Sequence, residues 1–208
     1  DDRPRDLGVA ATKSSVTDIV TVMDQRSQDH LLARLDTLRP MDAVMGEEKG
    51  GRAGTSGITW VVDPIDGTSK FANGERYFGM SVALMHQRRS VLGVVLDPNN
   101  GELFHAIRHT GAFLDGKRLR QRPTVHLHEA SIEVGRYKRL GRISHTLFHH
   151  PPFRKMAMSG ASVLQWCHLA SGRVDAFLHA GEQPWDYAAG ALILEEAGGR
   201  LATLLHDD

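Results

Sequence analysis

A short apolar run that ends in two closely spaced carboxylates is the feature that most restricts how this chain can fold. The run is Ile58-Thr-Trp-Val-Val62, and it is followed at once by Asp63-Pro-Ile-Asp66. Apolar, β-branched residues over this length predict a buried strand. Because a proline cannot continue a hydrogen-bonded ladder, the chain must turn after Asp63. The strand is therefore expected to deliver Asp63 and Asp66, three positions apart, to its carboxyl end.

This carboxyl end has the groups that a hard cation and a phosphate require. Two carboxylates and a free backbone carbonyl, such as that of Ile65, make an oxygen site of the kind that divalent cations bind. Gly67 lets the backbone approach a ligand closely. Thr68 is predicted to be the N-cap of a short helix, whose free N–H groups could seat a phosphate. An Asx-rich turn without any ligand explains the same residues, since Asp-Pro and Asp-Gly pairs are common in turns.

Three further segments place carboxylates beside the ends of predicted elements. They are Gly46-Glu47-Glu48 before a glycine-rich loop, Pro184-Trp185-Asp186 at the start of a helix, and the segment from Lys13 through Asp18 to Asp24. Each has its own structural explanation: a solvated surface pair, complementation of a helix dipole, or an N-cap. Taken together with Asp63 and Asp66, and without a His or Cys cluster, they favour Mg²⁺ and a phosphate ester.

The composition narrows the expected partners and compartment. The chain has 208 residues, with 25 Lys and Arg against 25 Asp and Glu, so its formal net charge is zero. Nucleic acid is therefore not an expected partner. A single cysteine, Cys167, fits a reducing, cytoplasmic location and is predicted to lie in the core. There is no run of about 20 apolar residues and no apolar signal segment, so no membrane association is expected. The basic residues Arg136, Lys138, Arg139 and Arg142 are predicted to form a solvated helix face.

The order of the predicted elements favours a layered α+β fold rather than a βαβ repeat. Hairpin signals at 98–101 and 115–116 join extended segments in the middle of the chain. The segment 136–152 shows no clear pattern, and His126-Leu-His128 fits part of a strand. Helices are predicted at 24–38, 161–171 and 186–197, and strands at 17–21, 58–62, 77–84, 91–97, 102–107, 131–134 and 174–178.

The four acidic segments resemble the inositol monophosphatase family, which consists of lithium-sensitive, Mg²⁺-dependent small-molecule phosphatases. The family's signature blocks, W-V-x-D-P-x-D-G-T and W-D-x-A-A-G followed by E-A-G-G, are similar to residues 60–68 and 185–199 of this chain. The resemblance implies a layered αβαβα sandwich of the sugar-phosphatase type, formed as one domain over 1–208 and assembled as a homodimer. It also implies that part of the family's first helix and its last strand and helix are missing.

The resemblance assigns metal ligands residue by residue. A first Mg²⁺ would be held by Glu47, Asp63 and the carbonyl of Ile65, and a second by Asp63, Asp66 and Asp186. A third, weaker ion would depend on Glu47 and solvent, and Mn²⁺ would be an acceptable substitute. Carboxylates this close together repel one another without metal, so the metal-free site is expected to be looser and less stable than the loaded one.

The same resemblance gives roles to the reacting groups. Glu47 and Thr68 would orient and deprotonate the attacking water, with Asp24 hydrogen-bonded behind Thr68. The backbone amides of Gly67 and Thr68 would bind the phosphate, and Lys13 would lie near metal-bound water. Metal charge offsets the repulsion between hydroxide and the phosphate dianion, and positioning supplies most of the remaining catalysis.

Substrate contacts are implied at Ala161, Ser162, His179 and Asp186. Inositol-specific members tend to carry a glutamate where this chain has His179, seven positions before Asp186. The leading prediction is hydrolysis of myo-inositol 1-phosphate. The alternatives are 3′-phosphoadenosine 5′-phosphate, which needs a stacking partner near His179, fructose 1,6-bisphosphate, which needs a second cationic pocket, and histidinol phosphate. An alternative of another class is a non-catalytic or moonlighting partner in a transcription complex.

Overall fold

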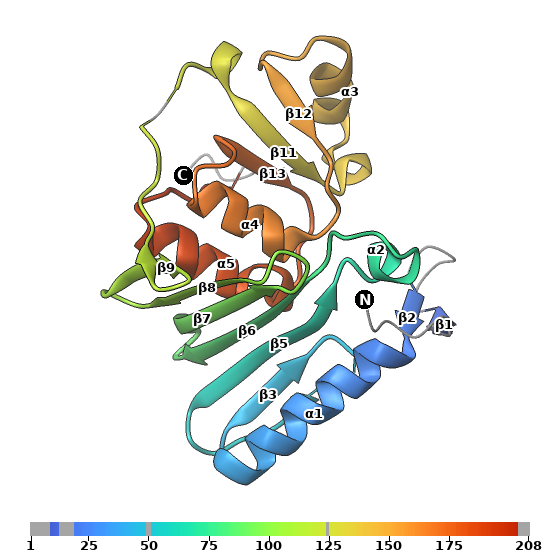
Figure 1. Ribbon diagram of the computed structural model, residues 1–208, viewed down its shortest axis with the longest axis vertical. Helices are drawn as coiled ribbons and strands as arrows, with labels where there is room; N and C mark the ends of the chain where they lie inside the picture. Colours follow the sequence, from blue (N-terminus) through green and yellow to red (C-terminus); the bar gives the residue numbers. More distant parts are fainter. Residues whose placement is uncertain (1–8, 13–18, 49–50, 124, 204–208) are drawn as a thin grey trace.

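Helices and sheets alternate in five layers, in the order helix, sheet, helix, sheet, helix (Figure 1). The structure, a computed structural model, describes residues 9–12, 19–48, 51–123 and 125–203. The predicted α+β fold, a layered αβαβα sandwich, is confirmed by this arrangement.

The larger sheet contains the acidic segment that ends in Asp63 and Asp66. Its strands are β3 (Ala43–Gly46), β4 (Gly51–Arg52), β5 (Ile58–Asp66), β6 (Gly79–His86), β7 (Arg89–Asp97), β8 (Glu102–Ile107), β9 (Gly111–Leu114) and β10 (Lys117–Arg118). Their order is β10-β9-β8-β7-β6-β5-β3-β4. Neighbouring strands are antiparallel, except that β3 and β5 run parallel. The parallel pair brings the carboxyl ends of two strands together, and this is where the site lies.

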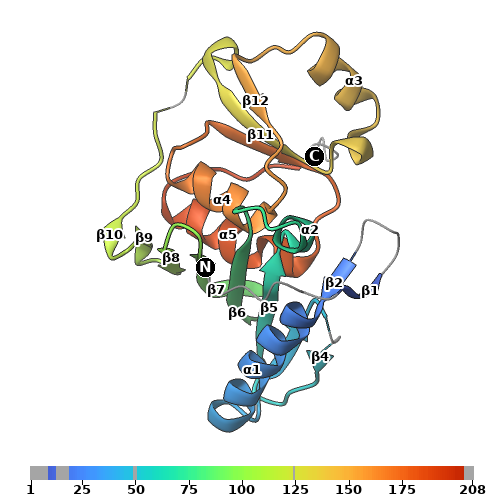
Figure 2. The ribbon, with the colours of Figure 1, turned by 45° about the vertical axis from the view of Figure 1, so that its right-hand side comes forward.

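The smaller sheet is parallel and lies at the other side of a helical layer (Figure 2). It consists of β11 (Ser131–Gly135), β12 (Lys155–Ala157) and β13 (Ala176–His179), with β11 in the middle. A separate antiparallel pair, β1 (Val9–Thr12) and β2 (Ile19–Thr21), precedes the first helix. β5 and β11 both end on the side of the molecule where the short helix α2 (Thr68–Ala72) lies (Figure 1). Segments far apart in the sequence therefore meet on that side.

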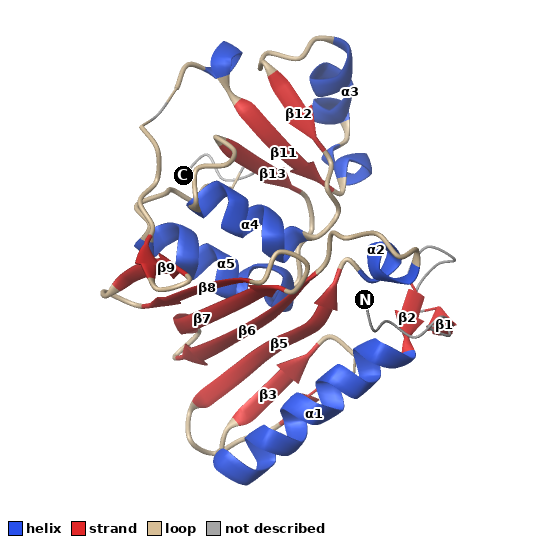
Figure 3. Ribbon diagram, in the orientation of Figure 1, coloured by secondary structure: helices blue, strands red, loops and turns tan. Residues whose placement is uncertain are grey.

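Two helices, α4 (Ser162–Ala170) and α5 (Pro184–Glu196), lie between the two sheets (Figure 3). Because α4 is covered on both sides, nearly all of its residues are buried. On the outer face of the larger sheet, α1 (Val22–Leu38) lies along β3 and β5. On the outer side of the smaller sheet lie α3 (Arg142–His149) and the 3-10 helix η2 (Tyr137–Leu140), and the 3-10 helix η1 (Leu127–Glu129) precedes β11.

Small residues allow α5 to approach both of its neighbours closely. A Cβ atom at Gly93 of β7 would lie 2.9 Å from Cα of Ala189, and one at Gly190 would lie 2.3 Å from Cβ of Trp166. The small residues at 188–190 therefore serve helix packing. Cys167 is fully buried in the same core, as predicted.

Most predicted elements are present with shifted ends, the segment 136–152 receives its assignment from the structure, and three predictions are wrong. The unassigned segment 136–152 folds mainly as η2 and α3. His126 is the N-cap of η1 rather than part of a strand. Thr68 is the first residue of α2, whose N-cap is Gly67, because a left-handed conformation at that position suits glycine. Asp24 is not an N-cap either, since α1 is capped by Thr21.

A helix that crosses a membrane must be both long and apolar. Within the part of the chain that the structure describes, no helix is both long enough and apolar enough to cross a membrane.

Candidate active site

The parallel strands β3 and β5 bring two acidic segments side by side. Gly46 pairs with Val62, so Glu47 and Asp63, the next residue on each segment, emerge together at the carboxyl end. The backbone N–H of Glu47 donates to the carbonyl of Val62 at 3.2 Å, which fixes the start of the loop. The pairing of β5 with β6 is irregular between Asp63 and Asp66, where Pro64 removes a ladder donor and the chain bends.

Asp63, Asp66 and Asp186 gather at this end, and one oxygen atom from each lies within 4.8 Å of the others. The Oδ1 atom of Asp63 accepts the backbone N–H of Ile65 at 3.1 Å. Its Oδ2 atom is buried, and no described residue gives it a hydrogen bond. A buried acceptor without a donor calls for a ligand. Carboxylate oxygens at this spacing are what a hard divalent cation binds, so the residues present fit Mg²⁺.

The starts of two helices hold the carboxylates of Asp66 and Asp186. Oδ2 of Asp66 accepts the backbone N–H of Val163 at 2.7 Å and the hydroxyl of Ser162 at 3.3 Å, both at the start of α4. Asp186 lies in the first turn of α5, and its Oδ2 accepts the backbone N–H of Gln183 at 2.8 Å. The positive ends of both helix dipoles therefore face the acidic cluster, which stabilises the charged carboxylates and fixes their orientation.

The carboxylates also raise one another's pKa values. Burial, followed by the charges of Glu47, Asp66 and Asp186, raises the pKa of Asp63 well above its ordinary value. Burial raises the pKa of Asp66 to about 7 against the opposing hydrogen bond from Val163, and the charges of Asp186 and Glu47 add to the rise. At neutral pH the protein alone does not fully stabilise the negative charge of this cluster. A divalent cation would supply the missing positive charge.

The hydroxyl of Thr68 lies between two acceptors beside the cluster. Its Oγ1 atom is 3.1 Å from Oδ1 of Asp24 and 3.0 Å from the carbonyl oxygen of Ile65. A hydroxyl has one proton, so it donates to one of them and keeps lone pairs for a further donor. Asp24 is fully buried, and its Oδ2 accepts the backbone N–H of Thr21 at 2.9 Å and the Thr21 hydroxyl. Burial raises the pKa of Asp24, which the hydrogen bonds from Thr21 and Thr68 oppose.

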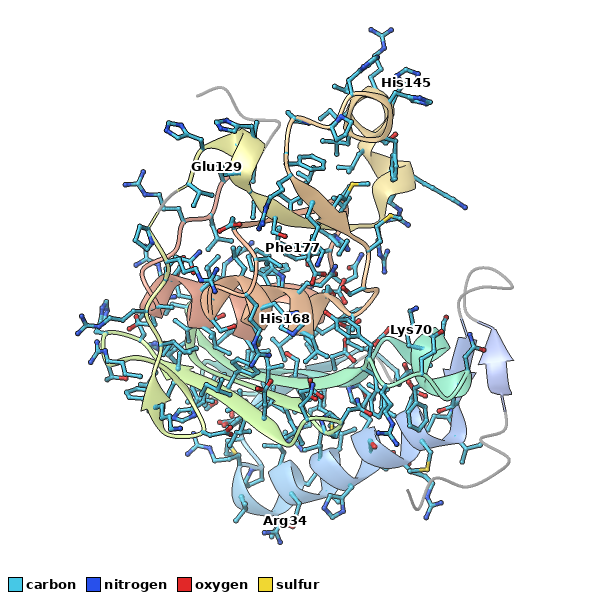
Figure 4. All side chains as sticks on the ribbon, turned by 45° about the horizontal axis from the view of Figure 1, so that its top comes forward. Arg34, Lys70, Glu129, His145, His168 and Phe177 are labelled. Atoms are coloured by element: carbon cyan, nitrogen blue, oxygen red, sulfur yellow. The ribbon has the colours of Figure 1, made fainter. Side chains whose placement is uncertain are left out.

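Gly67 joins the start of α2 to the start of α4. Its φ angle is +87°, and a Cβ atom there would lie 3.1 Å from both the Ala161 Cβ atom and the Tyr77 carbonyl oxygen. Glycine alone fits this position without strain or contact. The predicted residues Thr68, Ala161 and Ser162 consequently adjoin the acidic cluster. Lys70 of the same short helix (Figure 4) lies against Gly160, where a Cβ atom would be 3.2 Å from its Cε atom.

His179, the remaining predicted substrate contact, lies at the end of the smaller sheet. It is paired in register with Gly135 of β11, and its side chain is 8% exposed. Its Nδ1 atom is 3.9 Å from Oε1 of Glu182, which is too long for a hydrogen bond, and no described residue provides a shorter one. Burial, and then the charges of Arg136 and Arg139, lower the pKa of His179 to about 4. The imidazole is therefore neutral at pH 7.

Sequence reasoning does not identify three positioning residues of this site. Thr21 is the N-cap of α1 and holds the carboxylate of Asp24, and the Thr-x-x-Asp spacing of a capping box is its sequence signal. Gln28, one helical turn after Asp24, accepts the backbone N–H of Glu48 at 3.1 Å through its Oε1 atom. Glu182 accepts the indole N–H of Trp166 at 2.9 Å, and no local sequence pattern predicts this contact. The remaining predicted residues of the amino-terminal segment, Lys13 and Asp18, lie outside the described residues.

Comparisons with known proteins agree with this geometry. The family model described as "Inositol monophosphatase family" matches residues 2–205. An inositol monophosphatase 2 from Solanum lycopersicum is 38% identical over 199 residues, which cover 88% of this chain and 74% of the relative. A Nus factor SuhB from Pasteurella multocida is 35% identical over 197 residues, which cover 90% and 73%. A solved structure described as an IMPase/NADP phosphatase complexed with Mg²⁺ and phosphate has a TM-score of 0.80 at 27% identity, covering 90% of this chain and 72% of the other.

Proposed function

The chain belongs to the inositol monophosphatase family, and from this premise we propose that it is a Mg²⁺-dependent phosphomonoesterase acting on a small phosphorylated polyol. The observation that carries the proposal is the acidic cluster of Asp63, Asp66 and Asp186, which lies beside Glu47 and Thr68. The buried, unpaired Oδ2 atom of Asp63 supports a cation at this place. The description of the solved relative with Mg²⁺ and phosphate supports the same cation.

The chain supplies enough oxygen ligands for two ions. Glu47, Asp63 and the carbonyl of Ile65 would hold one Mg²⁺, and Asp63, Asp66 and Asp186 would hold the second. A third, weaker ion would depend on Glu47, and Mn²⁺ would substitute for Mg²⁺. When bound, the metal ions lower the pKa of water and offset the negative charge of the phosphate.

The remaining groups position the water and the phosphate. Glu47 and Thr68 orient the attacking water, and Glu47 accepts its proton. The Thr68 hydroxyl donates its hydrogen bond to Asp24, so that a lone pair on Oγ1 is left to accept a hydrogen bond from the water. The backbone N–H groups of Gly67 and Thr68 bind the phosphate. Thr21 keeps the Asp24 carboxylate oriented through its backbone N–H and its hydroxyl.

The leaving alcohol would lie among Ala161, Ser162, His179 and Asp186. Relatives named inositol-1-monophosphatase make myo-inositol 1-phosphate the reference substrate. The test is release of inorganic phosphate from this compound, glycerol 2-phosphate, 3′-phosphoadenosine 5′-phosphate, fructose 1,6-bisphosphate and histidinol phosphate, each with Mg²⁺ and with EDTA. We expect release that depends on Mg²⁺ and is inhibited by lithium. Absence of phosphate release from every compound of the panel would contradict the proposal.

Asp66→Asn tests the metal assignment within the same assay. Removing one charge-stabilising group from a catalytic site costs on the order of 100-fold in kcat, and we expect a loss at least that large. Asp29→Asn, which changes an exposed aspartate on α1, is the matched control and should retain full activity. Equal activity of the Asp66→Asn variant and the native chain would show that Asp66 is not a metal ligand.

A second candidate function is that of a partner in a transcription complex, and the name Nus factor carried by several relatives favours it. The acidic cluster of Asp63, Asp66 and Asp186 supports a phosphatase activity beside such a role. Gel filtration with purified bacterial RNA polymerase tests this candidate directly. Comigration that persists in the Asp66→Asn variant would establish a role independent of hydrolysis, and separate elution would exclude it.

We further infer that 1–208 forms one phosphatase domain, because α4 contacts strands of both sheets and packs against α5, which lies on the larger sheet. The family resemblance predicts a homodimer. Sedimentation equilibrium measures the mass directly, and a single species at the monomer mass would contradict this expectation.

A further inference from the structure

Two arginines, Arg136 and Arg139, lie near the end of the smaller sheet where Gly135 and His179 pair. They are outside the acidic cluster. β11 ends at Gly135, which pairs with His179, and Arg136 follows at once in a left-handed conformation with φ of 43°. A non-glycine residue rarely adopts this conformation, and here it turns the chain from the strand into η2. Arg139 lies one turn further along and contacts the next loop, because a Cβ atom at Gly181 would be 2.8 Å from its Nη1 atom. Both arginine side chains are exposed.

The charges around His179 make this corner a region of hydrogen-bond donors. Arg136 and Arg139 both act electrostatically on His179, and the buried imidazole itself is neutral. The positive charge of Arg136 favours the ionised form of the neighbouring Glu182. One carboxylate oxygen of Glu182 accepts the indole N–H of Trp166. Two guanidinium groups, one carboxylate and a neutral imidazole carry a net positive charge. Guanidinium groups donate and never accept, so they match the oxygens of an anion better than the hydroxyls of a neutral sugar.

This corner adjoins the acidic cluster. The loop that follows His179 leads through Glu182 and Gln183 directly into α5, where Asp186 belongs to the cluster. Glu182 lies four positions before Asp186, and burial together with the charge of Asp186 raises the pKa of Glu182. A substrate whose phosphate ester lies at the acidic cluster would therefore extend its leaving group toward Arg136 and Arg139.

We propose that Arg136 and Arg139 form a second anion subsite, which selects substrates that carry a further phosphate on the leaving group. The inference rests on the proposed function, because it takes the acidic cluster as the place of hydrolysis. It moves the preferred substrate from a monophosphorylated polyol to a bisphosphorylated one. His179 is the neutral, buried group beside the two arginines.

Binding of compounds that cannot be hydrolysed tests the subsite without turnover. Hexane-1,6-bisphosphonate and hexylphosphonate are titrated calorimetrically into the native chain with Mg²⁺, since a C–P bond resists phosphoester hydrolysis. Charge-assisted hydrogen bonds at an exposed pair of arginines are modest, so we expect the bisphosphonate to bind about tenfold more tightly. Arg136→Gln/Arg139→Gln should remove this advantage, and Arg142→Gln, a control of the same type on α3, should retain it. Equal affinities for the two compounds in the native chain would overturn the proposal.

Kinetics separate this inference from the proposed function. The ratio of kcat/KM for fructose 1,6-bisphosphate to that for glycerol 2-phosphate should fall about tenfold in the double variant, mainly through KM. Hydrolysis of glycerol 2-phosphate should remain unchanged. If the double variant hydrolyses both substrates with an unaltered ratio of kcat/KM, the subsite proposal is wrong and the proposed phosphatase activity stands. If the chain binds the bisphosphonate more tightly than the monophosphonate but releases no phosphate from any substrate, the subsite proposal stands and the proposed phosphatase activity is wrong.

Discussion

At the scale of single residues, the hydroxyl of Thr68 shows how much of this site depends on contacts made far along the chain. It reaches Asp24, 44 positions earlier, and Asp24 is held in turn by Thr21 at the start of α1. The carboxylate is buried, so it has no water to replace a lost partner. Thr68 is thereby held in one orientation before any substrate arrives.

Replacing Thr68 by valine removes the hydroxyl and keeps the shape of the side chain. If Thr68 orients the attacking water, kcat should fall by about 100-fold or more, which is the usual contribution of a positioned proton-transfer group. KM should change little, because the hydroxyl acts on the water and not on the substrate. Phosphate release at saturating substrate measures the effect. Thr37→Val, on the exposed face of α1, is the matched control and should behave as the native chain.

Sequence and structure agree best for the residues that carry charge in short motifs. The segments around Asp63, Asp66 and Asp186 predict an oxygen cluster, and the structure places these three carboxylates together. Gln28 and Glu182 are not predictable in this way. Their partners, Glu48 and Trp166, lie 20 and 16 positions away, and only the tertiary fold defines those contacts.

At the scale of elements, Asp42 joins α1 to the sheet that carries the site. Its carboxylate accepts from Arg39 at the end of α1 at 2.8 Å, from Ser56 at 2.7 Å and from the indole of Trp60 in β5 at 2.9 Å. Its side chain is 2% exposed. The hydrogen bonds from Arg39 and Ser56 are the main reason that the pKa of Asp42 is lowered to about 2 from its ordinary value of 3.8.

This lowered pKa predicts a loss of stability in acid. A carboxyl whose pKa is lower in the folded state stabilises the fold above its unfolded pKa, and the contribution disappears as the pH falls through the folded pKa. Asp42→Asn should therefore unfold at lower urea concentration than the native chain at pH 6. The difference between the two should shrink as the pH falls from about 4 to about 2. Urea unfolding across this range gives the result, and two parallel curves would contradict the prediction.

The contact between α5 and β7 makes a second prediction at this scale. In Gly93→Ala the new Cβ atom would meet the backbone of Ala189 at 2.8 to 2.9 Å, and backbone cannot move aside as a side chain can. Overpacking of this kind costs about 1–3 kcal/mol of unfolding free energy. Chemical denaturation measures the loss, and Ser90→Ala in the same strand should change stability by less than about 0.5 kcal/mol. A gain in stability for Gly93→Ala would mean that α5 and β7 can separate without cost.

Helices with strong signals were predictable at this scale, and irregular elements were not. The pattern from Asp24 to Leu38 and the Gly-Gly pair after Ala197 locate α1 and α5 closely. The segment 136–152 mixes basic, aromatic and small residues without a period. Its fold as η2 and α3 follows from Leu140 and Leu147, which pack on β11 to make the second core. Only the finished sheet provides that surface.

At the scale of the whole molecule, the layered architecture determines where negative charge accumulates. Two sheets and the helical layer between them direct strand ends and helix starts to one side, so carboxylates from β5 and α5 meet there. The sequence predicts the layers from the alternation of hairpins and helices. It does not predict the division of the strands into an eight-stranded and a three-stranded sheet, because strand pairing depends on contacts between distant segments.

This accumulation of charge predicts that removal of metal destabilises the molecule in a way that depends on pH. The pKa values of Asp63 and Asp66 are raised in the folded state, that of Asp66 to about 7. The folded chain therefore binds more protons than the unfolded chain between about pH 4 and pH 7, so the stability of the metal-free form falls as the pH rises through this window. Magnesium should offset the loss, since it binds the ionised carboxylates. We expect saturating Mg²⁺ to raise the Tm by about 5 °C or more at pH 8, and by clearly less at pH 5. Differential scanning calorimetry with EDTA and with Mg²⁺ at the two pH values measures both shifts, and Asp66→Asn should reduce the difference between them. An equal Mg²⁺ effect at pH 5 and pH 8 would show that repulsion among these carboxylates does not govern the stability of the metal-free fold.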